Sequence, residues 1–359
     1  MNDHTARFVF LLICLGSTSA GFAVPAIIDT VVVFDHGTEG YHTFRIPALA
    51  RTHDNTLLAF CEGRKNGMID TGDIDLVLRR SQDGGRTWSP LILVVDDAAN
   101  TCGNPVPVVL HSGEILLVLT KNDGDATENE INRGTAAPRS VWLTRSKDDG
   151  VTWSTPEEIS AQVRKSTWRW YATGPGHGIQ IRTGRIVVPA NHSLDETPSS
   201  WHSHVIISDD GGQNWSLGGE AESMTNESTV AELSDGRLYL NMRNYRGSHR
   251  RAFSFSDDGG AHWSAVREDP ALTEPVCQAS VLAAGRLLLF ANPASEKRER
   301  LTVRISPDGG RSWPNALLLH DGPSAYSDLA ALADGAACLY ECGEKQAYEH
   351  IAFTKFILD

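Results

Sequence analysis

Six short stretches of the chain share one pattern of polar and apolar positions. Each places a turn containing Gly or Asn before a continuous apolar run, and the stretches span 51–60, 110–119, 181–190, 233–242, 282–291 and 332–341. A turn followed by such a run is typical of a tight hairpin that leads into a buried strand. No long helical pattern lies between them, and their intervals of roughly 50 to 70 residues are typical of propellers and arrays. The pattern therefore predicts an all-β fold, a six-bladed β-propeller.

A second repeat alternates with the hairpins. The spelling S-x-D-x-G-x-x-W occurs at 81–88, 146–153, 208–215, 256–263 and 306–313. The Asp can accept hydrogen bonds from its own turn, the Gly can take a positive φ, and the Trp can cover the blade below. A calcium loop would need further acidic ligands at fixed offsets, and these are missing. We therefore expect the octapeptides to build the scaffold, with the chemistry elsewhere.

Composition narrows the function classes. The chain has 359 residues, of which 41% are hydrophobic and 21% charged, as in a soluble globular protein with a sizeable core. The net charge of −13 argues against a nucleic-acid partner, which would need a basic face. An anionic substrate would require a local positive centre that overcomes this global charge.

The first residues read as a targeting segment. The apolar run "FVFLLICLG" is followed by small residues up to a cut after Ala23, which predicts a signal peptide over 1–23. The run is too short to span a bilayer and no other stretch looks transmembrane, so we expect no stable membrane insertion. The expected mature unit is a single propeller domain over 24–359 that is secreted or periplasmic.

The cysteines do not indicate a disulfide framework or a metal site. Five remain after the leader, irregularly spaced and without a CxxC signature: Cys61, Cys102, Cys277, Cys338 and Cys342. Cys338 and Cys342 would lie on one strand, too far apart to bridge. We expect no metal and no other cofactor to be needed for activity.

Polar residues should gather at one end of the propeller. The first strand of each hairpin begins, and the second ends, at the same mouth, so residues far apart in sequence meet there. These positions are Arg45, Asn104, Glu227 and Tyr326 at strand starts, and Glu62, Arg64, His192, Arg243 and Glu341 at strand ends. Such convergence of opposite charges predicts a site rather than a solvated face.

These residues also carry a family resemblance. The stretch "FRIP" at 44–47, followed by five octapeptides, resembles the sialidase (neuraminidase) superfamily, specifically bacterial and animal exo-α-sialidases. The stretches "RWYATGPGHGIQ", "LYLNMR" and "LTVRISPDGG" are similar to that family too, so the resemblance covers nearly the whole chain after the leader. It implies a glycoside hydrolase that removes terminal α-linked sialic acids from glycoproteins, glycolipids and oligosaccharides.

The resemblance assigns an arginine clamp for the sialic acid carboxylate. Arg45 matches the first arginine and Arg243 the second, while Arg298 fits the third, with Arg304 as the alternative. Glu341 resembles the acid that holds the first arginine in place. Charge-assisted bonds from three guanidinium groups would supply the positive centre that the net charge requires.

The resemblance also assigns the reacting groups. Tyr326 matches the nucleophile and Glu227 the carboxylate that activates it, an exception to the two-carboxylate glycosidase scheme. A neutral phenol suits an anomeric carbon that bears a carboxylate, because a carboxylate nucleophile would be repelled. The general acid/base should be Asp70, chosen over Asp73 and Asp75 in the same loop region, with a pKa raised when substrate covers it.

The resemblance also assigns residues that contact the sugar, and three competing functions remain. Arg64 and Asn104 match positions that contact the 4-hydroxyl of the sugar, and Trp168, Trp170 and Tyr171 could either stack on it or pack in the core. The competing functions are a sialic-acid-binding propeller without turnover, a trans-sialidase and an intramolecular trans-sialidase. Linkage preference, N-acetylated against deaminated sugar, and oligomeric state are left open by the sequence.

Overall fold

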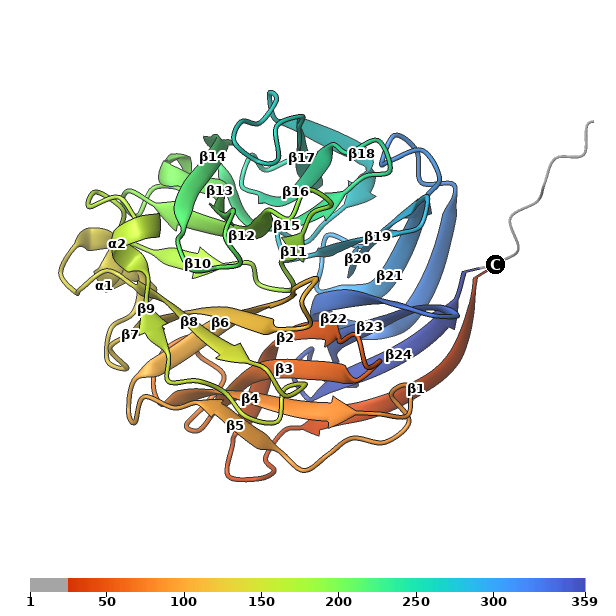
Figure 1. The fold of residues 1–359 in the computed structure, drawn as a ribbon, viewed down its shortest axis with the longest axis horizontal. Helices are drawn as coiled ribbons and strands as arrows, with labels where there is room; N and C mark the ends of the chain where they lie inside the picture. Colours follow the sequence, from red (N-terminus) through yellow and green to blue (C-terminus); the bar gives the residue numbers. More distant parts are fainter. Residues whose placement is uncertain (1–24, 359) are drawn as a thin grey trace, which may run out of the picture.

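Four hydrogen-bonded sheets make up the protein, here a computed structural model that describes residues 25–358. The predicted leader, 1–23, lies outside the described residues. The sheets are arranged around a common centre (Figure 1). The few helical turns lie in connections: α1 (Glu128–Arg133), α2 (Ser160–Val163) and the 3₁₀ turn η1 (Pro198–Ser200). The prediction of an all-β fold is confirmed.

The first sheet contains eight strands. They are β2 (Thr43–Arg51), β3 (Leu57–Arg64), β4 (Ile74–Ser81), β5 (Ile92–Val95), β6 (Thr101–Val109), β7 (Ile115–Asn122), β8 (Ser140–Ser146) and β9 (Glu157–Glu158). The pairs are antiparallel except where Ile74 of β4 meets Thr101 of β6 in a single parallel contact. That contact joins two groups of four strands.

The next two sheets follow in chain order. One comprises β10 (Tyr171–Thr173), β11 (Ile179–Gln180), β12 (Ile186–Ser193), β13 (Trp201–Ser208) and β14 (Ser216–Ser223). The other comprises β15 (Thr225–Glu232), β16 (Leu238–Asn244), β17 (Arg250–Ser256) and β18 (Arg267–Thr273).

The last sheet brings the two ends of the described chain together. Its strands are β19 (Ser280–Ala284), β20 (Leu287–Pro293), β21 (Glu299–Ser306), β22 (Asn315–Leu332), β23 (Gly335–Cys342), β24 (His350–Ile357) and β1 (Ala26–Asp35). The first strand β1 pairs antiparallel with the last strand β24 along its whole length (Figure 1). This pairing fastens the start of the chain to its end.

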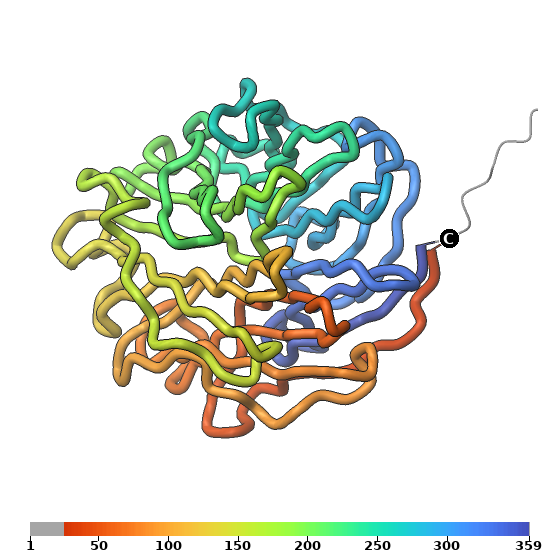
Figure 2. The backbone as a smooth tube through the Cα atoms, in the orientation of Figure 1, coloured from red at the N-terminus to blue at the C-terminus, as the bar shows by residue number. Residues whose placement is uncertain are grey.

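All six predicted hairpins are present. The turns join antiparallel neighbours in the pairs β2–β3, β6–β7, β11–β12, β15–β16, β19–β20 and β22–β23. The second strand of each hairpin is almost wholly buried, as its apolar run predicted. Around the centre, β2 packs against β6 and β22, β15 against β12 and β19, and β19 against β22. Figure 2 shows the chain following this circuit.

The octapeptides form the expected local hydrogen bonds. In the first copy, Asp83 accepts from the Ser81 hydroxyl at 2.9 Å and from the Thr87 backbone N–H at 3.0 Å. Gly85 has a φ of 93°, and a Cβ there would collide with the ring of Phe353. The tryptophans are less uniform than expected, because among the five only Trp215 is buried and the other four are half-buried.

Two further observations concern residues 25–358. All five cysteines in this range are buried and unbridged. No helix in the range is long and apolar enough to cross a membrane.

Candidate active site

A cavity of about 370 Å³ collects the residues that the sequence placed at the mouth. Eight of the nine predicted site residues line it: Arg45, Arg64, Asp70, Asn104, Glu227, Arg243, Arg298 and Tyr326. The ninth, Glu341, lies directly behind Arg45. Five arginines and four carboxylates line the cavity. The wall therefore carries net positive charge within a chain of net charge −13, which suits an anionic ligand.

Tyr326 and Glu227 meet across the cavity floor. The Tyr326 hydroxyl donates to Glu227 Oε1 at 2.5 Å, and Arg243 Nη1 donates to Glu227 Oε2 at 2.8 Å. Tyr326 comes from β22, whereas Glu227 and Arg243 come from the paired strands β15 and β16. Burial, together with the Glu227 charge, raises the pKa of Tyr326 well above its ordinary value. The phenol is therefore neutral and is aimed at a proton acceptor.

Glu341 organises the opposite side of the floor. Its fully buried carboxylate accepts from Arg45 Nε at 3.1 Å, from Ile46 N at 2.9 Å and from Tyr326 N at 3.0 Å. A buried carboxylate needs such partners to offset its lost hydration. One side chain thereby fixes both Arg45 and the backbone of Tyr326.

The third arginine of the cavity is Arg298. It lines the cavity wall and donates to the Tyr348 hydroxyl at 2.6 Å, while its guanidinium lies 5.7 Å from the centre of the Tyr326 ring. The alternative, Arg304, does not line the cavity and donates instead to the Asn292 side chain at 3.2 Å. Of the two, only Arg298 is close to Arg45 and Arg243.

The three candidate aspartates have different surroundings. Asp70 approaches Arg64 Nη2 at 2.7 Å and Arg45 Nη1 at 3.3 Å, with its side chain 64% exposed. Asp73 and Asp75 both pair with Lys65, and neither lines the cavity. Partial burial alone would raise the pKa of Asp70, but Arg64 and then Arg45 hold it below its ordinary value. The raised pKa expected for a covered acid is thus not the state of the open cavity.

Arg64 and Asn104 belong to a buried polar network. Arg64 Nη2 contacts Glu62 Oε2 at 2.6 Å, and Glu62 Oε1 accepts from Asn104 N at 2.9 Å. Arg139 Nη1 donates to Asn104 Oδ1 at 2.8 Å and lies over the ring of Trp170. These contacts hold one wall of the cavity rigid.

One expected mouth residue faces the wrong way. His192 was placed at the end of its strand facing the mouth, but its neighbour Asn191 lines the cavity and His192 points into the core. Successive side chains of a strand point to opposite faces, so an offset of one residue exchanges the two. Trp168 and Tyr171 are likewise in the core, whereas Trp170 lines the cavity.

Sequence reasoning missed several lining residues. They are Glu128, Asn191, Trp201, Tyr245 and Tyr348. Asn191 is 1% exposed, and neither its Oδ1 nor its Nδ2 has a hydrogen-bond partner among the described residues. Strict alternation along β12 would have found Asn191. Glu128 and Tyr348 come from α1 and from a connection, where the sequence gives no comparable signal.

The chain is similar in sequence to a known domain family and to known sialidases. Residues 55–339 match a family described as a BNR repeat-like domain. The exo-alpha-sialidase of Aspergillus fumigatus is 32% identical over 88% of this chain and 80% of its own length. Sialidase-3 of Homo sapiens is 32% identical over 88% of this chain and 89% of its own length.

A solved structure agrees in fold as well as in sequence. The Hadza microbial sialidase Hz136 superposes with a TM-score of 0.81 and 32% identity, over 90% of this chain and 67% of that chain. Identity of this order over most of both chains is a relationship of whole domains. The chain therefore belongs to the sialidase (neuraminidase) family, and it is a glycoside hydrolase.

Proposed function

We propose that this protein is a retaining exo-α-sialidase that hydrolyses terminal α-linked sialic acids through a tyrosyl-enzyme intermediate. The observation that carries the proposal is the 2.5 Å contact between the Tyr326 hydroxyl and Glu227 beneath three arginines. Binding alone would need only the arginines. The pairing of a buried phenol with a carboxylate supports turnover.

In the first step, the Tyr326 oxygen attacks the anomeric carbon while Glu227 takes the phenolic proton. The bond from that carbon to the leaving-group oxygen breaks, and Asp70 donates a proton to that oxygen. In the second step, Asp70 takes a proton from water, the water oxygen replaces Tyr326, and Glu227 returns its proton to the phenolate. Two displacements at one carbon restore the original configuration.

The arginines explain why a tyrosine serves here. The anomeric carbon of a sialic acid carries a carboxylate, which Arg45, Arg243 and Arg298 would bind from three sides. An anionic nucleophile would be repelled by that carboxylate, whereas Tyr326 approaches without charge and shows a raised pKa. Glu341 holds Arg45 in place for this contact.

Bound substrate would also raise the pKa of Asp70, the proposed general acid. In the open cavity Arg45 and Arg64 keep Asp70 ionised. A bound carboxylate would compete for Arg45, and the sugar would cover the exposed side chain, so both changes raise the pKa of Asp70. Asp70 therefore becomes protonated, and able to donate, only when substrate is bound.

The fold and location extend the proposal. We infer six blades, because six hairpins surround the centre and β1 completes the last blade beside β24. The Asp-containing octapeptides and the 44–47 stretch fit the same family pattern. We also propose secretion or export to the periplasm with cleavage after Ala23, which N-terminal sequencing of the exported protein would test.

Proton NMR of sialyllactose during digestion tests the reaction. We expect the α-anomer of free sialic acid to appear first, followed by mutarotation, and we expect Tyr326→Phe to lose this turnover while staying folded. First appearance of the β-anomer would overturn retention. Transfer to an added acceptor galactoside other than lactose, or an anhydro product, would instead identify one of the two transferase alternatives, and no product would favour a binding protein.

A further inference from the structure

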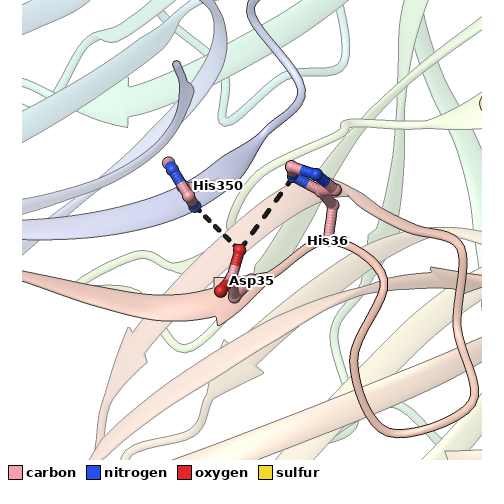
Figure 3. Close-up of side chains that lie close together, drawn as sticks. All are labelled: Asp35, His36 and His350. Atoms are coloured by element: carbon pink, nitrogen blue, oxygen red, sulfur yellow. Dashed lines mark hydrogen bonds and ion pairs between the residues drawn. The ribbon is translucent and has the colours of Figure 1, made fainter. Parts of the chain in front are cut away.

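Two histidines and an aspartate meet where the ends of the described chain pair. Asp35 closes β1 and His36 follows it, while His350 opens β24 (Figure 3). His350 Nδ1 lies 3.1 Å from Asp35 Oδ1, and His36 Nδ1 lies 4.0 Å from the same oxygen. One ligand atom from each residue lies within 4.8 Å of the others. This group is outside the cavity.

The chemistry of these three side chains fits a borderline-soft divalent ion. Imidazole nitrogen and carboxylate oxygen are ordinary zinc ligands, at about 2.0–2.2 Å from the ion. Ligands at that radius are separated by roughly 3 to 4 Å, which matches the two nitrogen-to-oxygen separations found here. Two imidazoles and one carboxylate leave a fourth position for water, and the strongly negative chain favours cations.

The backbone holds the three residues in place. Asp35 and His350 are direct partners in the β1–β24 register. The His36 backbone is fixed because its N–H donates to the Glu349 carbonyl at 3.1 Å; its Nδ1 also donates to that carbonyl at 2.7 Å, a bond that ion binding would replace. An ion would replace the protons that His36 Nδ1 and His350 Nδ1 now donate, since a ring nitrogen carries either a proton or a metal.

We propose that Asp35, His36 and His350 form a binding site for a divalent transition-metal ion, for which Zn²⁺ is the probe. Among residues 25–358, no other histidine–carboxylate group brings three ligand atoms this close together. His262 with Asp258, for example, has one imidazole and one carboxylate, at 2.7 Å. That pair provides a matched control.

The site is coupled by geometry to the cavity. His350 lies two residues after Tyr348, whose hydroxyl contacts Arg298 and whose ring lies 4.2 Å from the Arg45 guanidinium. The same loop is tied internally, because the Glu349 carboxylate accepts from Glu344 N at 2.7 Å. An ion would therefore fasten the loop that places Tyr348 against two arginines of the clamp. This second part rests on the proposed function, whereas ion binding does not.

Isothermal titration calorimetry with ZnCl₂ on untagged, chelator-treated protein tests the site. We expect one equivalent of Zn²⁺ for the wild type and for His262→Ala, and loss of that equivalent in His36→Ala and His350→Ala. Zn²⁺ should raise the melting temperature of the wild type but not of His350→Ala. Unchanged stoichiometry in both ligand variants, or no saturable binding to the wild type, would mean that Asp35 and His350 form only an ion pair.

Steady-state kinetics tests whether the bound ion affects substrate binding through Tyr348, separately from whether the ion binds. With a sialoside substrate, Zn²⁺ should lower KM for the wild type without changing kcat, and His350→Ala should not respond. Zn²⁺ binding without a change in KM would overturn the coupling to Tyr348. If the protein has no sialidase activity, calorimetry still decides whether the ion site exists.

Discussion

As the pH falls, this protein should unfold at a higher pH than protonation of its carboxylates alone would cause, because a histidine cluster is buried behind the cavity wall. His192 and His204 are at most 1% exposed on the paired strands β12 and β13. His192 stacks on Trp168 with ring centres 3.5 Å apart, and its Nδ1 faces His204 Nδ1 at 3.1 Å. His204 Nε2 contacts the Tyr171 hydroxyl at 3.0 Å.

A proton added to His192 or His204 would place a positive charge in this packing without a close anionic partner. Within residues 25–358, the buried His192 Nε2 has no hydrogen-bond partner, and the nearest carboxylate oxygen, Glu220 Oε1, is 3.9 Å away. Lys165 and His202 add positive potential nearby. Burial first, and then His204, hold the pKa of His192 far below its ordinary value. Burial first, and then Lys165, lower the pKa of His204 to about 3.

The direction and size of the change in unfolding free energy with pH follow from the linkage between protonation and folding. A histidine whose pKa is lowered by folding stabilises the fold fully only above its unfolded pKa of about 6.5, and this stability is lost as the pH falls below that value. Each such group costs about 1.4 kcal/mol per pH unit over that range. The two together should remove about 5 kcal/mol between pH 6.5 and 4.5, a large share of the 5–15 kcal/mol typical of a domain.

Urea unfolding at a series of pH values measures the effect. The variant His192→Asn should lower the slope of unfolding free energy against pH by about 1.4 kcal/mol per unit between pH 6.5 and 4.5. The control His262→Asn changes a side chain that is 88% exposed and should leave the slope unchanged. Equal slopes for His192→Asn and the wild type would show that His192 is already protonated in the fold, and would refute the reasoning.

Four further substitutions separate the site from the scaffold. Asp70→Asn should cut kcat/KM, which reports formation of the tyrosyl intermediate, by about 10²–10⁴-fold on sialyllactose but far less on an aryl sialoside, whose leaving group needs no proton; equal losses in kcat/KM would contradict the acid role. Arg45→Lys should cost about 1.5–3 kcal/mol in kcat/KM, roughly 10- to 150-fold, with little change in melting temperature. Trp215→Ala, at a side chain only 5% exposed, should cost about 3–5 kcal/mol of stability in urea unfolding and leave KM unchanged in the folded fraction. Trp263→Ala should cost less, because that ring is half-buried.

The sequence was most informative where local physics decides the structure. Each apolar run after a turn can only be a buried strand in this context, and all six hairpins are in place. Charged residues at strand ends, such as Arg45, Glu227 and Arg243, converge because antiparallel strands share that edge of the structure. Their identities followed from the family resemblance, since spacing alone cannot distinguish a clamp from an ion pair.

The remaining features depend on tertiary packing. His192 and Asn191 were exchanged because the strand end was located only to within a residue. Tyr348 reaches the cavity from a connection whose path is set by contacts with His36, far away in sequence. The lowered pKa of Asp70 reflects two arginines from β2 and β3, which no local pattern reveals.

Trapping the covalent intermediate tests the central claim most directly. On a 2,3-difluorosialic acid, the Tyr326 oxygen should displace fluoride from the anomeric carbon, and the resulting intermediate should hydrolyse slowly because the fluorine that remains at C3 destabilises the cationic transition state. Peptide mass mapping should then place one sugar on Tyr326, with no label in Tyr326→Phe. A label on another residue, or no label from a preparation that hydrolyses sialyllactose, would contradict the proposed nucleophile.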